Sequence, residues 1–152
     1  MPIVNSQVPT SVKIWHPELV NIYNSVIGEN TKIAAFVEIG NSRIGANCKI
    51  EAFAFIPPGS IIEDNVFIGP HVCLTNDRYP SANGKWNCEP VTIKEGASIG
   101  ANSVICPGVT INNHALIGAG SVVSENVLPY QIVHGTKAKF HNKIVNQTEN
   151  EL

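Results

Sequence analysis

Residues 91–123, VTIKEGASIGANSVICPGVTINNHALIGAGSVV, carry a branched aliphatic side chain at every sixth position. The same register continues upstream, and 13 of the 19 isoleucines in the chain fall on it. Its 15 members are Ile27, Ile33, Ile39, Ile44, Ile50, Ile56, Ile62, Ile68, Leu74, Ile93, Ile99, Ile105, Ile111, Ile117 and Val123. Such regularity exceeds what an ordinary core requires, so the repeat defines the architecture.

An interval of six contains the two-residue period of a β-strand three times and does not match the 3.6-residue period of a helix. A short strand and a turn in every six residues direct one aliphatic side chain inward, and three such units close a triangular coil. Small residues four positions after the aliphatics, such as Ala97, Ser103 and Val109, fit tight corners. The pattern therefore predicts an all-β fold, a parallel β-helix of hexapeptide repeats.

Grouping the register in threes gives coils that begin at residues 27, 44, 62, 93 and 111. Five coils at the usual strand spacing make a rod of about 24 Å. A degenerate coil around Val20 and Ile22 would bring the number to five or six. We expect a single domain over residues 1–152, with the rod at about 20–128 and a C-terminal extension at about 129–152.

Two irregularities fall at one corner of the predicted rod. Residues 40–43 are one residue short of a hexapeptide, and residues 75–92 insert 13 extra positions between Leu74 and Ile93. A regular rod gains a site where it is interrupted, so the insertion is the expected place for chemistry.

Composition narrows the function classes. The chain has 152 residues, of which 43% are hydrophobic and 14% charged, as expected for one compact domain. A net charge of −2 argues against a nucleic-acid surface, and no apolar run is long enough to cross a bilayer. The N-terminus lacks a basic-then-apolar signal pattern, so we expect a cytoplasmic protein. The four cysteines match no metal-ligand spacing, and we expect neither a metal nor a disulfide.

The inserted segment begins at residue 75 with the letters TNDRYPSANGKWNCEP. A plain surface turn is one interpretation, since Asn, Asp, Pro and Gly are the residues that turns use. The density of reactive and binding groups favours a functional loop that closes a cleft between two rods. The candidate substrate-binding residues are Arg78, Tyr79, Lys85 and Trp86.

The rod resembles the left-handed β-helix acyltransferase superfamily. Residues 36–39 and 44–50, and above all the LTNDRYP stretch at 74–80, are similar to N-acetyltransferases of nucleotide-linked amino sugars. The similarity covers roughly residues 14–139. It implies left-handed coils, a homotrimer, and acetyl-CoA in the grooves between subunits. It also implies a dTDP- or UDP-linked amino sugar as acceptor, in the synthesis of bacterial surface glycans such as lipopolysaccharide.

The chain departs from that family at three places. Ser81 stands where members often have Arg, and Phe53 stands where they often have His. Residues 135–138 read GTKA, where the family often has a Gly-Asn-Pro-Ala turn. These differences bear on the identity of the sugar nucleotide and on the contacts to the coenzyme phosphates.

The implied reaction is aminolysis of a thioester, which needs a deprotonated amine held against the acetyl carbon. Asp77 can accept a hydrogen bond from the amine, and Asn76 can orient it. His71 lies one coil above Phe53 in the same column, so it either stacks on that ring or acts as the general base. Ala101 and Ala119 beside glycines could line the pantetheine arm, and Lys137 and Lys139 could meet the adenosine phosphates.

Other functions stay open at this point. O-acetylation of a sugar or small alcohol is the main alternative, and dependence on His71 would favour it, because a hydroxyl needs a strong base. A carbonic anhydrase of the same rod fold would need two histidines with four residues between them, a spacing that the sequence lacks. A non-catalytic scaffold would have no reason for the inserted loop.

Overall fold

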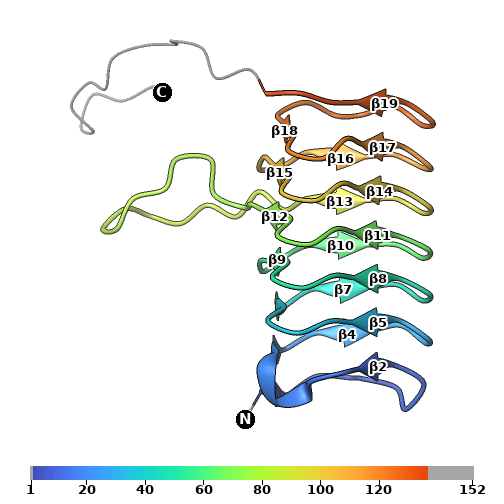
Figure 1. Cartoon of the computed structure of the whole chain (residues 1–152). Coiled ribbons are helices and arrows are strands. Elements are labelled where there is room, and N and C mark those ends of the chain that lie inside the picture. The colour runs from blue at the N-terminus through green and yellow to red at the C-terminus, as the bar shows by residue number, and fades with distance from the viewer. Residues whose placement is uncertain (1, 137–152) are drawn as a thin grey trace.

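The computed structural model describes residues 2–136, which form a rod of stacked triangular coils with one protruding loop (Figure 1). Parallel pairing joins the coils into three sheets, called here faces A, B and C. The prediction of a left-handed parallel β-helix is confirmed. None of the helices within residues 2–136 has the length and apolar character needed to cross a membrane.

The strands are two or three residues long. Face A contains β1 (Ile3–Val4), β3 (Asn21–Tyr23), β6 (Glu38–Gly40), β9 (Phe55–Ile56), β12 (Cys73–Leu74), β15 (Val104–Ile105) and β18 (Val122–Val123). Face B contains β4 (Val26–Ile27), β7 (Arg43–Ile44), β10 (Ile61–Ile62), β13 (Thr92–Ile93) and β16 (Thr110–Ile111). Face C contains β2 (Lys13–Ile14), β5 (Lys32–Ile33), β8 (Lys49–Ile50), β11 (Phe67–Ile68), β14 (Ser98–Ile99), β17 (Leu116–Ile117) and β19 (Ile132–Val133). A short 3-10 helix, η1, spans Pro17–Leu19.

The rod is longer than its aliphatic register. Faces A and C each contain seven strands, and single bridges at Gln7 and Val127 extend the five strands of face B at both ends. The five coils predicted at 27, 44, 62, 93 and 111 begin at the five strands of face B. The predicted number of five to six coils was low because Gln7 breaks the aliphatic register in the first layer, and η1 disturbs the spacing that follows it.

The register aliphatics fill the interior, as predicted. Ile50, Ile68 and Ile99 lie in successive layers of face C and are at most 1% exposed. Each fully buried isoleucine contributes about 1.5 to 3 kcal/mol from the hydrophobic effect. The small corner residues are buried too, and Thr31 Oγ1 donates to the carbonyl of Gly45 at 2.8 Å.

The corners bend through residues in the left-handed backbone region. Phe36, Phe53 and His71 occupy successive layers of the corner between faces C and A, with φ of 61°, 64° and 59°. This conformation costs a non-glycine residue roughly 1 to 2 kcal/mol. Stacking of the three rings offsets part of the cost, at centroid distances of 4.8 Å and 4.7 Å. The column predicted for Phe53 and His71 is confirmed.

Both predicted irregularities lie at the corner between faces A and B. Residues 41 and 42 connect β6 to β7 there, and the long loop connects β12 to β13. Ile50 pairs with Ile68 across an interval of 18 residues, whereas Ile68 pairs with Ile99 across 31. The stacking therefore continues above and below the loop without a change of register.

Candidate functional site

The base of the loop is fastened to the rod by Asn76. Its side-chain amide donates to the carbonyl of Pro58 in the layer below, at 2.9 Å. Its backbone carbonyl accepts from the N–H of Glu89 at 2.8 Å, which ties the two ends of the loop together. Asn76 thus has a fixed position at the point where the loop leaves the corner.

Arg78 makes a second set of contacts that hold the loop, including one to the layer above. Its Nε donates to both carboxylate oxygens of Glu89, at 3.0 and 3.2 Å, and its NH2 group donates to the carbonyl of Pro107 at 3.0 Å. The Glu89 carboxylate raises the pKa of Arg78, which keeps the guanidinium charged. Arg78, predicted to bind substrate, therefore has its charge engaged by the protein itself. Glu89 could not be identified from the sequence, because a partner 11 residues away becomes adjacent only when the loop closes.

Beyond this base the loop encloses a shallow hollow of about 270 Å³. Its walls include the predicted residues Asp77, Arg78, Tyr79 and Lys85, together with Asn87, which was not predicted, and Glu89. The structure thus brings together four of the six loop residues assigned from sequence. Trp86 lies outside the hollow and is 58% exposed.

Asp77 is oriented by the turn that it begins. Its Oδ1 accepts a hydrogen bond from the backbone N–H of Tyr79 at 3.2 Å, an arrangement typical of Asp in turns. Among residues 2–136, no donor meets the other carboxylate oxygen, Oδ2. An oriented carboxylate on the wall of a hollow can accept a hydrogen bond from a substrate amine.

His71 lies at a different corner of the same coil. It occupies the corner between faces C and A, and β12 separates it from the loop. Its ring is nearly parallel to that of Phe53, with an interplanar angle of 6°. The structure does not bring His71 to Asn76 and Asp77 within one chain, so a role at that site would need a second copy.

Ala101 and Ala119, predicted to bind coenzyme, lie at the corner between faces C and A, where successive layers pack closely. A Cβ added at Gly69 would lie 2.7 Å from the nitrogen of Ala101, and one added at Gly100 would lie 2.5 Å from the nitrogen of Ala119. Ala101 and Ala119 therefore stand in successive layers of a column with little side-chain bulk, above Pro70 and next to the column of His71 and Asn102. Lys137 and Lys139 lie outside the described residues.

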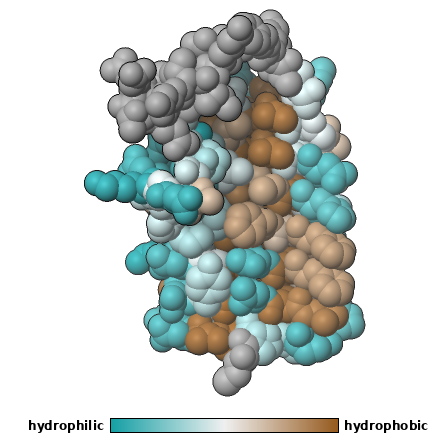
Figure 2. Space-filling view, turned by 90° about the vertical axis from the view of Figure 1, so that its left-hand side faces the viewer, coloured by the Kyte–Doolittle hydropathy of each residue, from teal (hydrophilic) through white to brown (hydrophobic). Residues whose placement is uncertain are grey.

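Face A connects this corner to the loop, and a hydrophobic band runs along it (Figure 2). Phe55, Cys73, Val104 and Val122 form the band from successive layers, and Phe55 and Val122 are 38% and 46% exposed. Burial raises the pKa of the Cys73 thiol, so that group remains protonated. The band is a surface suited to contact with another apolar surface.

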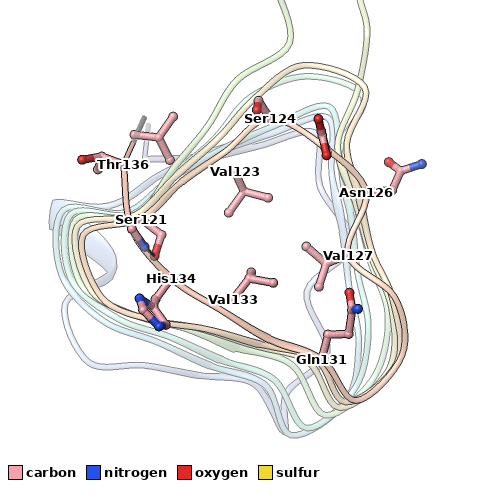
Figure 3. A pocket seen from close by; sticks show the side chains of 12 residues that line it. Ser121, Val123, Ser124, Asn126, Val127, Gln131, Val133, His134 and Thr136 are labelled. Carbon is pink, nitrogen blue, oxygen red and sulfur yellow. Dashed lines mark hydrogen bonds between the residues drawn. The ribbon is translucent and has the colours of Figure 1, made fainter. Parts of the chain in front are cut away.

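A larger hollow, of about 440 Å³, lies at the C-terminal end of the described rod. Val123, Val127 and Val133 point into it, one from each side of the triangle (Figure 3). These valines line the inside of the last described coil, so the hollow is the interior of the solenoid and lies apart from the loop. Among residues 2–136, no three His, Cys, Asp or Glu side chains are grouped as a metal site requires.

The ion pair between Arg78 and Glu89 gives a prediction that can be tested without an enzyme assay. Glu89→Gln should expose the Arg78–Tyr79 and Lys85–Trp86 bonds to trypsin, with cleavage faster by roughly twofold to fivefold. The melting temperature should move by less than about 3 °C, because exposed ion pairs add little to global stability. Glu63→Gln is the matched control, since it removes the Lys94 pair away from the loop. Equal cleavage of Glu89→Gln and the parent protein would mean that the pair does not hold the loop.

The sequence matches the family described as Bacterial transferase hexapeptide (six repeats) at residues 41–76 and 90–125, on either side of the loop. No curated protein matches it.

Three solved structures share the fold. A hexapeptide-repeat acetyltransferase from Vibrio cholerae, complexed with acetyl coenzyme A, has 26% identity and a TM-score of 0.66, covering 78% of this chain and 68% of its own. The N-acyltransferase AntD from Bacillus cereus, a variant with dTDP and coenzyme A, has 22% identity and a TM-score of 0.68, covering 95% and 83%. A variant perosamine N-acetyltransferase from Caulobacter crescentus, with CoA and GDP-perosamine, has 22% identity and a TM-score of 0.60. The match covers 88% of this chain but only 53% of that protein.

The family match to the repeats on both sides of the loop and the fold shared with the solved structures lead to the same conclusion. The chain is a hexapeptide-repeat protein with the left-handed β-helix fold of the hexapeptide acyltransferases.

Proposed function

We propose that this protein is an acetyl-CoA-dependent N-acetyltransferase that acts on the amino group of a nucleotide-linked amino sugar, in the synthesis of bacterial surface glycans. The observation that carries the proposal is the hollow in the loop, where Asp77, Tyr79 and Lys85 gather beside a fastened base. The complexes of AntD with dTDP and of the perosamine enzyme with GDP-perosamine support a nucleotide sugar as the acceptor.

The chemistry needs positioning more than covalent catalysis. A sugar amine is mostly protonated at neutral pH, and it must lose a proton before it attacks the thioester carbonyl. Asp77 Oδ2 would accept a hydrogen bond from the amine, and Asn76, at the start of the loop, would orient that amine. Holding the nitrogen in line with the acetyl carbon contributes several kcal/mol toward the barrier. The C–N bond forms as the C–S bond breaks, and coenzyme A leaves as the thiol.

Acetyl-CoA would lie along the corner between faces C and A. A pantetheine arm is thin and needs close access to backbone groups, and Gly69, Gly100, Ala101 and Ala119 place no large side chain at this corner. Lys137 and Lys139 follow this corner in the sequence and would pair with the phosphates.

The direct test is a product screen. The protein is incubated with acetyl-CoA and a panel of dTDP- and UDP-linked amino sugars, and mass spectrometry detects an added acetyl group. Matched sugars with a hydroxyl in place of the amine form the control panel. Acetylation of the amino sugars alone is expected, whereas acetylation of both panels at equal rates would point to O-acetyl transfer.

A homotrimer is part of the proposal. The hydrophobic band on face A is more apolar surface than an isolated rod needs to expose, and the three-fold assembly implied by the family resemblance would cover such a surface. Light scattering should return about three times the 16.3 kDa of one chain. Val122→Glu, which places a charge on the band, should reduce that mass. A fully active monomer would contradict a site shared between subunits.

A further inference from the structure

Three lysines stand directly above one another on the first layers of face C. Lys13 of β2 pairs in register with Lys32 of β5, which pairs in turn with Lys49 of β8. Neighbouring strands lie about 4.8 Å apart, and like charges placed opposite one another on a sheet destabilise it. This lysine strip therefore has an electrostatic cost that its own fold does not require.

The protein compensates the strip only in part. Lys49 Nζ lies 2.9 Å from Glu51, and Lys13 Nζ lies 4.6 Å from the centre of the Trp15 ring. Lys32 makes neither an ion pair nor a side-chain hydrogen bond within residues 2–136. Of the three ammonium groups, only that of Lys49 has an ion-pair partner within residues 2–136.

The carboxylates at the neighbouring corners have other partners. Glu29 accepts a hydrogen bond from Ser11, and Glu18 lies 3.3 Å from His16. Neither forms an ion pair with a strip lysine.

A hollow of about 260 Å³ lies beside the strip. Trp15, Ala34 and Glu51 follow the inward isoleucines of β2, β5 and β8 and so form one column. Ala34 leaves a gap between its two larger neighbours, and Trp15, at 47% exposure, borders that gap. Lys49, paired with Glu51, also lines the hollow, and Lys32 of β5 lies two residues before Ala34. A flat ring with the cations of the strip alongside it suits a ligand that is both aromatic and anionic.

The loop hollow lacks this charge. Arg78 and Lys85 are balanced there by Asp77 and Glu89, so it offers no net attraction to a diphosphate. A nucleotide sugar has one amine and two phosphates, and the two ends need different surroundings.

We propose that the lysine strip binds the diphosphate of a nucleoside diphosphate, with Lys32 and Lys49 as the principal contacts and the base beside Trp15. The strip lies below the layer that carries the loop, so in a side-by-side assembly it can hold the nucleotide while the loop of another subunit holds the sugar. The choice of a nucleotide as ligand rests on the proposed function, whereas the anion site itself rests on the strip alone.

Titration calorimetry with UDP, dTDP and inorganic pyrophosphate tests the strip without any acetyl transfer. All three should bind, with affinity that falls as salt increases. Lys32→Gln should weaken binding by roughly tenfold, the Lys32→Gln, Lys49→Gln double variant by more, and Lys32→Arg by little. Arg43→Gln removes an exposed cation of β7, in the same layer as Lys49 but on face B, and should bind as the parent does. In a Trp86→Phe background Trp15 is the sole tryptophan, and UDP should change its fluorescence more than pyrophosphate does.

The outcomes separate the two proposals. Undiminished UDP affinity in the double variant, or no binding of UDP and pyrophosphate to the parent, would overturn the strip. Strip-dependent binding without acetylation of any amino sugar would leave the strip standing and refute the proposed function. Equal weakening by Arg43→Gln would reduce the effect to general surface charge and would also overturn the proposal.

Discussion

Asp77→Asn should lower kcat/KM for an amino-sugar acceptor by roughly tenfold to a thousandfold, with little change in acetyl-CoA affinity. The substitution keeps an oxygen that can accept from the Tyr79 N–H, so the turn at the start of the loop is preserved. It removes only the negative charge that would meet the substrate amine. Steady-state kinetics and calorimetric titration of acetyl-CoA measure the two quantities separately.

Three further variants complete this test. Asn76→Ala should lose turnover through the lost bond to Pro58 as well as through its contact with substrate. His71→Phe keeps the stack on Phe53 while removing an ionisable ring, so activity near that of the parent would exclude His71 as the base. Near-normal turnover by the Asn76→Ala, Asp77→Ala double variant would refute the loop as the active site.

Ile68→Asp should leave the protein unfolded or insoluble. Ile68 is fully buried between Ile50 and Ile99, and the change loses about 2 to 3 kcal/mol of burial and adds a larger cost for an unpaired carboxylate. Against a typical domain stability of about 5 to 15 kcal/mol, this single change removes a large share. Circular dichroism and thermal melting provide the measurement.

Ile68→Val is the control for that experiment. It should remain folded at a cost of about 0.5 to 1.5 kcal/mol, because it removes one methylene from the same position. A wild-type melting temperature for Ile68→Asp would show that the aliphatic register does not mark the interior.

The rod could be predicted from the sequence because one property repeats. Each inward isoleucine reports its own layer, and an interval near 18 is enough by itself to place Phe53 one layer below His71. Gln7 and η1 break the interval, which is why the first layer could not be recognised. The lysine strip was missed because its spacing is irregular. Lys13 and Lys32 are 19 residues apart across η1, and Lys32 and Lys49 are 17 apart across the shortened repeat at residues 40–43.

The loop was located but its internal geometry was not. The residue types in 75–92 indicate a binding segment, yet they do not say that Arg78 would be held by Glu89 and Pro107. Such pairings depend on how the loop closes, and no periodicity constrains that closure. Asn87 also lines the hollow. Its position depends on the same loop closure, so the sequence alone did not identify it as a binding residue.

The unbroken pairing on both sides of the loop has a consequence for how such a protein can change over evolutionary time. Cys73 and Leu74 pair with Val104 and Ile105 just as the strands of uninterrupted layers pair with each other. An insertion or deletion within the loop therefore need not shift any strand, and lengthening a surface loop costs little chain entropy. If the loop binds the acceptor, as proposed above, acceptor preference can diverge by mutations in the loop while the rod is maintained by separate selection on its isoleucines.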